Sequence, residues 1–178
     1  MKVSKIAELW HVSLIQLVKK NTFTYIDSEN SWSNDKRCSL LENMLSGFPI
    51  GLITIYKTYK EHECIEYVLD GFNRLSTVTE AFSDNSDYYI HLDTNKIERR
   101  NRRKDAYHMS LKSVMDSVAM YKEEKRLEEK LGKTYSIRAR IIAERFYDYY
   151  IPTATIITND KEELKIYCKE VHKKDLSI

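Results

Sequence analysis

Residues 70–77, Asp-Gly-Phe-Asn-Arg-Leu-Ser-Thr, bring together groups that could bind a phosphate. They follow an apolar run typical of a strand and open a stretch with helical spacing. A helix N-terminus attracts anions because its first N–H groups lack partners within the helix. Gly71 allows a tight turn and the close approach of a ligand, and Arg74 can grip a phosphate through two parallel hydrogen bonds. With hydroxyl donors from Ser76 and Thr77, the pattern predicts a phosphate site.

Two further residues of this segment have a functional and a structural interpretation. Asp70, at the end of the strand, could hold a metal ion or a sugar hydroxyl. Asn73 could contact the ligand or could cap the helix, since Asp-Gly before a helix is also a common turn. From spacing alone both interpretations stay open.

A second candidate site is the basic stretch of residues 96–104. We predict nucleic-acid contacts from five of its cations: Arg99, Arg100, Arg102, Arg103 and Lys104. Tyr107 and His108 follow closely enough to stack on a base. The same stretch could instead be a solvated loop, or it could close over the phosphates of a nucleotide.

The composition suits an ordered, globular protein of the cytoplasm. The chain has 178 residues, 42% of them hydrophobic, with four Gly, two Pro and a formal net charge of +2. Residues 1–95 hold 9 Lys or Arg against 13 Asp or Glu, and residues 96–178 hold 20 against 14, so the second half could present a basic face. Three unpaired cysteines indicate a reducing compartment, and the five histidines show no ligand spacing with them. We expect no signal peptide and no membrane span.

Apolar spacing predicts the elements that position these groups. We expect one domain over residues 1–178, of α+β class, with a small mixed sheet surrounded by helices and a helical insertion at about 96–150. The expected helices cover residues 3–19, 34–46, 73–82, 110–131, 136–150 and 161–171. The expected strands cover residues 25–26, 52–56, 64–69, 88–92 and 155–158, with 64–69 closing a hairpin and Pro152 ending the helix before the last strand.

The order of motifs resembles the DGQQR-motif domain of GmrSD-type modification-dependent restriction enzymes, a family with the ParB/sulfiredoxin-like fold. That family has a Trp, a helix, a "g-f/y-P-i-G" turn and a strand, then a second strand ending in DGQQRLTTL. Here the matching features are Trp32, Gly-Phe-Pro-Ile-Gly at 47–51, and Asp-Gly-Phe-Asn-Arg-Leu-Ser-Thr-Val at 70–78. Residues 150–152 before a strand, and a helix with Leu164, Tyr167 and Val171, are similar to the closing part of the family.

The resemblance implies a nucleotide-binding domain in nucleic-acid metabolism or in phage–host defence or counter-defence, and it allows weak Mg²⁺-dependent hydrolysis of the nucleotide. It implies nucleotide contacts from Asp70, Gly71, Asn73, Arg74 and Ser76, and we expect Thr77 to join them. We expect Asp70 and Arg74 to be the catalytic residues, and Asp70 to be the Mg²⁺ ligand. Expected partners are a nucleoside triphosphate, DNA or a defence-system protein, and a second copy of the chain.

The chain also departs from the family pattern. Phe72 replaces the first Gln of the motif, and Glu29-Asn30-Ser31 stands where the family has a Gln-Arg pair before its Trp. No HNH nuclease region follows, so we expect no nuclease activity of that type. These departures support an alternative function, a non-catalytic module that binds DNA or protein and acts as an inhibitor or decoy of a defence system.

Overall fold

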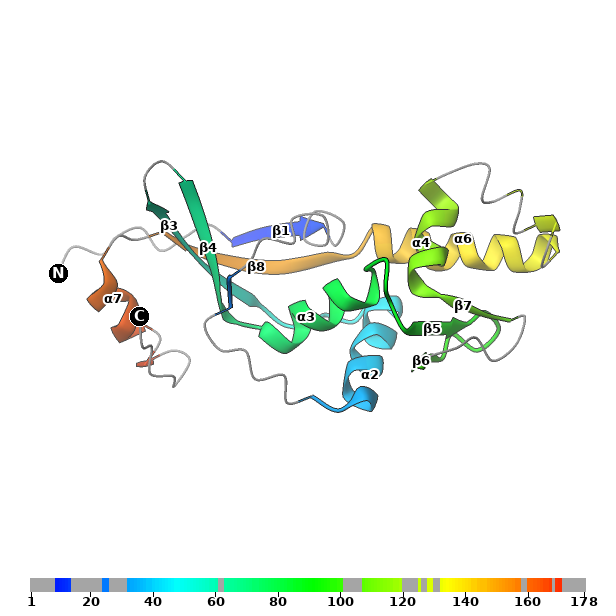
Figure 1. Ribbon diagram of the computed structural model, residues 1–178, viewed down its shortest axis with the longest axis horizontal. Helices are drawn as coiled ribbons and strands as arrows, with labels where there is room; N and C mark the ends of the chain where they lie inside the picture. The colour runs from blue at the N-terminus through cyan, green and yellow to red at the C-terminus, as the bar shows by residue number, and fades with distance from the viewer. Residues whose placement is uncertain are drawn as a thin grey trace.

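The computed structural model is elongated, with helix α7 near one end and helix α6 at the other (Figure 1). It describes residues 9–13, 24–25, 32–60, 63–100, 107–119, 125, 128–129, 132–157, 160–167 and 169–170. Within these ranges the fold combines two separate sheets with helices, which confirms the predicted α+β class. None of the helices described has the length and apolar character needed to cross a bilayer.

The larger sheet has five strands in the order β1-β8-β3-β4-β2. Its central strand β3 (Ile53–Lys60) pairs antiparallel with β4 (Glu63–Asp70), as the predicted hairpin requires, and parallel with β8 (Tyr150–Ile157). The edge strands are β1 (Leu9–Ser13), antiparallel to β8, and β2 (Thr24–Tyr25), parallel to β4. The β3–β4 register shifts by one residue at the last pairs before Gly71, and such a bulge re-aims the end of a strand.

The smaller sheet has three antiparallel strands in the order β6-β5-β7. They are β5 (Tyr88–His91), β6 (Ile97–Arg99) and β7 (His108–Ser110). The sequence predicted β5 but not β6 or β7, because three-residue strands show too little alternation to be recognised. Residues 96–150 therefore contain two strands in addition to helices.

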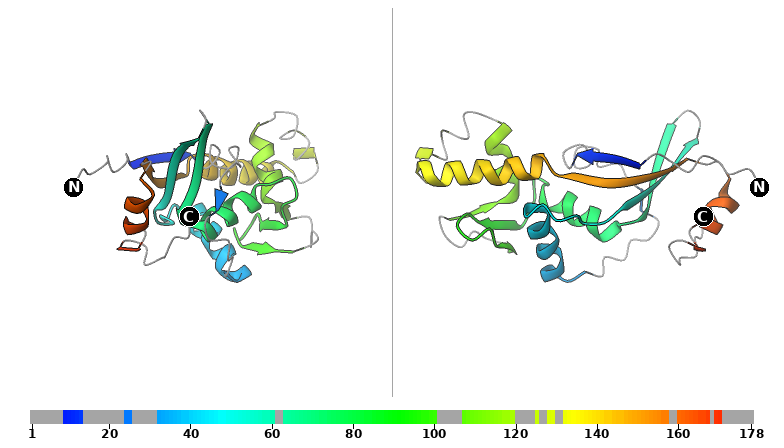
Figure 2. Two further views of the ribbon diagram at one scale, coloured as in Figure 1. Left: turned by 60° about the vertical axis from the view of Figure 1, so that its left-hand side comes forward. Right: turned by 180° about the vertical axis from the view of Figure 1, so that it is seen from behind.

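Five helices have bounds given by the structure: α2 (Asn34–Leu45), α3 (Phe72–Ala81), α4 (Leu111–Ala119), α6 (Lys133–Tyr147) and α7 (Lys161–Tyr167). Ser33 caps α2, since its hydroxyl accepts a hydrogen bond from the backbone N–H of Lys36 at 3.3 Å. Helices α4 and α6 pack together beside the smaller sheet (Figures 1 and 2).

Two apolar cores lie on opposite faces of the larger sheet. The main core joins both sheets to α2, α3, α4 and α6, and its fully buried side chains include Leu41, Ile53, Leu75, Ile90 and Phe146. The rings of Phe82 and Phe146 meet edge to face at 5.1 Å. The smaller core places Leu164 of α7 against Tyr56 and Leu69, whose side chains alternate with those of the main core along β3 and β4.

Two predicted elements are wrong in the described part of the chain. Residues 9–13, predicted as part of a helix over 3–19, form strand β1, because pairing with Tyr150–Ala154 of β8 outweighs the local helical spacing. The helix before β8 ends at Tyr147, and Pro152 lies inside the strand. At Pro152 strand β8 pairs only with β1, because its pairing with β3 begins at Thr153. The N–H group that proline lacks is therefore not needed for a hydrogen bond to the central strand.

Candidate functional site

The predicted phosphate-binding segment forms a strand, a one-residue turn and a helix. Strand β4 ends at Asp70, Gly71 adopts the left-handed conformation with φ 93° and ψ 15°, and α3 begins at Phe72. Non-glycine residues rarely adopt this conformation. Because the N-cap is a glycine, no capping side chain closes this end of the helix, and its first-turn N–H groups must find other partners.

The guanidinium of Arg74 is held across this turn by two hydrogen bonds. Nη2 donates to Oδ2 of Asp70 at 2.9 Å, and Nη1 donates to the carbonyl oxygen of Ile50 at 3.2 Å. The Arg74 side chain is mostly buried, whereas the Asp70 side chain is 39% exposed. Arg74 is therefore a positioned cation beside the helix N-terminus.

The turn over residues 47–51 forms the other wall of the site. Gly51 has φ +87°, and a Cβ atom at this position would lie 2.4 Å from Nη1 of Arg74. A Cβ at Gly71 would lie 3.0 Å from Cγ1 of Ile53 and 3.4 Å from Nη2 of Arg74. Both glycines thus leave the space that the guanidinium occupies. The sequence assigned no site role to Gly51, although its place in the Gly-Phe-Pro-Ile-Gly motif was the signal that could have found it.

Asn73, a predicted nucleotide contact, has a side-chain oxygen that lacks a hydrogen-bond donor within the part of the chain that the structure describes. Its Oδ1 atom is buried and has no hydrogen-bond partner among the described residues. A buried acceptor without a donor is costly, so this atom could take a hydrogen bond from a ligand.

The hydroxyls of Ser76 and Thr77 point back into the helix. Both donate to the carbonyl oxygen of Asn73, at 3.2 Å from Ser76 and 2.6 Å from Thr77. Thr77 is completely buried and Ser76 nearly so. The structure therefore brings Asp70, Gly71 and Arg74 together at the turn, with Asn73 beside them in the first turn of α3. Of the Asp70 and Arg74 side chains that of Asp70 is the more exposed, and Thr77 lies in the core behind them.

The predicted nucleic-acid contacts that can be examined are already engaged. Nε of Arg99 donates to both carboxylate oxygens of Asp87, at 3.0 and 2.8 Å, and this bonding raises the pKa of Arg99 above its usual value. Arg100 forms an ion pair with Glu98. His108 is buried and so offers no ring face to a base, while Tyr107 is exposed. Arg102, Arg103 and Lys104 lie outside the described residues.

A network of ion pairs fixes the far end of α3 and was not predicted from the sequence. The buried guanidinium of Arg37 in α2 donates to Glu80 of α3 at 2.6 Å, and Arg99 of β6 lies 3.8 Å from the same carboxylate. Arg99 also lies over the ring of Tyr88 at 5.3 Å. These partners are far apart in sequence and have no local motif, so only the fold could reveal them.

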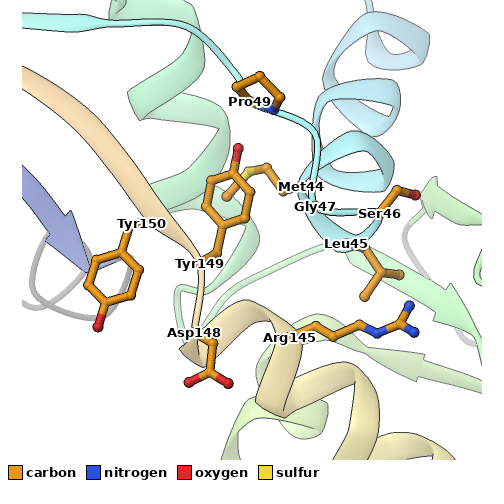
Figure 3. Close-up of a pocket in the computed structure, with 9 residues that line it drawn as sticks. All are labelled: Met44, Leu45, Ser46, Gly47, Pro49, Arg145, Asp148, Tyr149 and Tyr150. Carbon is orange, nitrogen blue, oxygen red and sulfur yellow. The ribbon is translucent and has the colours of Figure 1, made fainter.

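A pocket of about 640 Å³ lies beside the 47–51 turn. Its lining comes from the end of α2, this turn, and the junction of α6 with β8: Met44, Leu45, Ser46, Gly47, Pro49, Arg145, Asp148, Tyr149 and Tyr150 (Figure 3). The Tyr149 hydroxyl donates to the carbonyl oxygen of Phe48 at 2.6 Å, which ties the turn to β8. Burial raises the pKa of Tyr149 above its ordinary value of 10.0.

Comparison with known proteins identifies a family for this chain. Residues 26–175 match the family described as the GmrSD restriction endonuclease, N-terminal domain. No curated protein matches the chain. The match includes the 47–51 turn, the Asp70–Arg74 turn and the closing strand and helix, and it confirms the resemblance inferred from these motifs. Restriction is a defence against phage, so the role of the protein lies in phage-defence restriction. The chain belongs to the GmrSD restriction endonuclease N-terminal domain family.

Proposed function

We propose that the protein binds a nucleoside triphosphate at the turn between β4 and α3, within its role in restriction. The observation that carries the proposal is the position of Arg74, which Asp70 and the Ile50 carbonyl fix beside the N-terminus of α3. A positioned guanidinium and a helix N-terminus are complementary to the phosphate chain. The unpartnered Oδ1 of Asn73 offers an acceptor for a sugar hydroxyl or a base amino group.

The charge of the site makes Mg²⁺ part of this proposal. Asp70 offsets the charge of Arg74, so a triphosphate without a counterion meets a site of little net positive charge. Asp70 is partly exposed, and Mg²⁺ in proteins is commonly held by one or two carboxylates, substrate phosphates and water. Within the described residues no group of three His, Cys, Asp or Glu side chains could hold a metal ion. Asp70 therefore fits an ion that arrives with the nucleotide, and the ion would supply charge neutralisation between the carboxylate and the phosphates.

We expect binding rather than efficient hydrolysis. Phe72 takes the place of a polar residue in the turn, and Asp70 and Arg74 are engaged with each other. Hydrolysis would need a group that positions water against the terminal phosphate. Asp70 and Arg74 remain the residues that we propose for any residual turnover.

Calorimetric titration with ATP, GTP, CTP and UTP in the presence of Mg²⁺ tests the proposal. We expect one of them to bind to the wild-type protein and Arg74→Ala to abolish this binding. Arg140→Ala is the matched control, because Arg140 also pairs with a carboxylate four residues away, Glu144, but on the surface of α6. Binding by none of the four, or equal binding by wild type and Arg74→Ala, would contradict the proposal.

The alternative function, a DNA-binding module, has weaker support. Two of its five predicted cations are already paired, Arg99 with Asp87 and Arg100 with Glu98. Binding a DNA phosphate would have to replace one of these partly exposed pairs, each worth at most about 1 kcal/mol.

A further inference from the structure

The outer face of α6 carries a stripe of residues that the protein does not cover. Ile137 and Ile141 are exposed, the latter by 42%, and Arg145 and Asp148 follow on the same face at helical spacing. The stripe ends at the pocket of Figure 3, where the ring of Tyr150 is 57% exposed. Large apolar side chains grouped in this way on a surface mark an interaction site more often than single ones do.

Arg145 and Asp148 have opposite charges and lie three residues apart on the helix, a spacing at which side chains usually interact. They do not pair. Among the described residues neither takes part in an ion pair, and Figure 3 shows their side chains pointing in different directions along the rim of the pocket. The neighbouring Arg140 and Glu144 pair with each other at 3.6 Å, so the helix does form such pairs where the geometry allows.

We propose that this face binds a second copy of the chain around a two-fold axis. In a two-fold interface the same patch lies on both subunits. If one residue of the first copy contacts a second residue of the other copy, the reverse contact is also made. A patch that holds one unpaired cation and one unpaired anion is complementary to itself, since Arg145 of each copy faces Asp148 of the other. The axis passes between these two positions and sets the C-terminal ends of the two α6 helices antiparallel.

Apolar area contributes to the same contact. Ile141 lies one turn before Arg145, and Tyr150 lies at the opposite rim of the pocket. Burial of these side chains between two copies removes apolar surface from water, while the two symmetric ion pairs fix the orientation of the copies. The concave pocket gives the exposed side chains of the other copy a surface to pack against.

The site proposed for the nucleotide is not part of this interface. Arg74 and Asp70 interact with each other and with the Ile50 carbonyl, and none of them lines the pocket. Nucleotide binding and self-association can therefore be measured separately, and the failure of one leaves the other unaffected.

Charge reversal gives a test that uses the full chain. Sedimentation equilibrium of the wild-type protein in the micromolar range is expected to show a dimer. Arg145→Asp places two acids opposite each other across the axis and Asp148→Arg places two cations, so each variant alone is expected to be monomeric. When the two variants are mixed in equal amounts, every acid faces a cation again, and a heterodimer is expected.

The control is Glu162→Arg, an equivalent charge reversal on α7, at the other end of the molecule (Figure 1). It is expected to leave the dimer unchanged. The proposal is overturned if the wild-type protein is monomeric across this range, if both single variants remain dimeric, or if the mixture of monomeric variants does not associate. A monomeric wild type would leave the face to a different protein partner.

Discussion

Gly51 and Arg74 are packed so closely that the structure leaves no room for a side chain on the glycine. A Cβ atom on Gly51 would lie 2.4 Å from Nη1 of Arg74, the same nitrogen that donates to the Ile50 carbonyl. Gly51 lies in the turn before the β3–β4 hairpin and Arg74 lies in α3 after it, so the whole hairpin separates them in the sequence. The position of the cation therefore depends on the backbone of another segment as much as on Asp70.

We predict that Gly51→Ala lowers nucleotide affinity by displacing the Arg74 guanidinium. The left-handed conformation also costs an alanine about 1–2 kcal/mol. Gly47→Ala is the control, because Gly47 has a similar φ of +79° but nothing within 4 Å of its Cβ position. Both variants should lose similar stability in urea unfolding from backbone strain alone, and only Gly51→Ala should lose affinity in calorimetry. Equal affinity in the two variants would show that the Gly51–Arg74 contact is unimportant for binding.

Replacement of Asp70 by Asn should change the metal dependence of binding. In the wild-type protein the carboxylate offsets Arg74, so we expect the nucleotide to bind much more weakly when EDTA replaces Mg²⁺. In Asp70→Asn the site carries an uncompensated cation and has lost its metal ligand, so affinities with Mg²⁺ and with EDTA should converge. Titrations of both proteins under both conditions measure this. If the wild-type protein binds equally well in EDTA, Asp70 only positions Arg74.

The ion pair between Arg37 and Glu80 should stabilise the fold. The Arg37 side chain is buried, so Arg37→Met leaves Glu80 without its closest partner and should lower the free energy of unfolding by about 2 kcal/mol, less than for a fully buried pair because Glu80 is partly exposed. Lys165→Met, which breaks the exposed pair with Glu162, should cost less than about 0.5 kcal/mol. Urea unfolding of both variants measures these losses of unfolding free energy. Equal losses in the two variants would be inconsistent with a buried pair between Arg37 and Glu80.

The hydroxyl of Tyr149 should contribute a pH-dependent stabilisation. Tyr149→Phe removes the hydrogen bond to the Phe48 carbonyl and should cost about 1 kcal/mol near neutral pH. Because burial raises the pKa of Tyr149 above 10.0, the folded protein holds the proton more tightly than the unfolded chain. The stabilisation is therefore complete below pH 10.0 and falls as the pH rises above it. Thermal unfolding across this range should show the difference between Tyr149→Phe and wild type becoming smaller, and a constant difference would argue against the pKa shift.

The sequence was sufficient where the signal was local. The β3–β4 hairpin follows from the alternation of apolar residues, and the start of α3 follows from the glycine at position 71. The sequence was insufficient where pairing with a distant segment determines the local structure. Strand β1 is the example, because its strand conformation depends on pairing with β8.

The site shows the same division. The residue types of Asp70, Gly71, Asn73 and Arg74 could be read from the sequence, but their hydrogen bonds could not. Thr77 has the same hydroxyl as a ligand-facing threonine, and only its place in the helix directs it to the Asn73 carbonyl. Likewise, nothing local to Arg99 indicates that Asp87 already holds it.

The parallel pairing of β3 with β8 has a consequence for synthesis of the protein. Residues 53–57 pair with residues 153–157, so the central strand lacks one neighbour until most of the chain has left the ribosome. Long-range pairing of this kind slows folding, and an unpaired central strand can associate with other chains. The segment that carries Gly51 and Gly71 is made early, but its supporting sheet is completed late. Nascent chains that stop before Tyr150 should therefore be recognised by chaperones as incomplete.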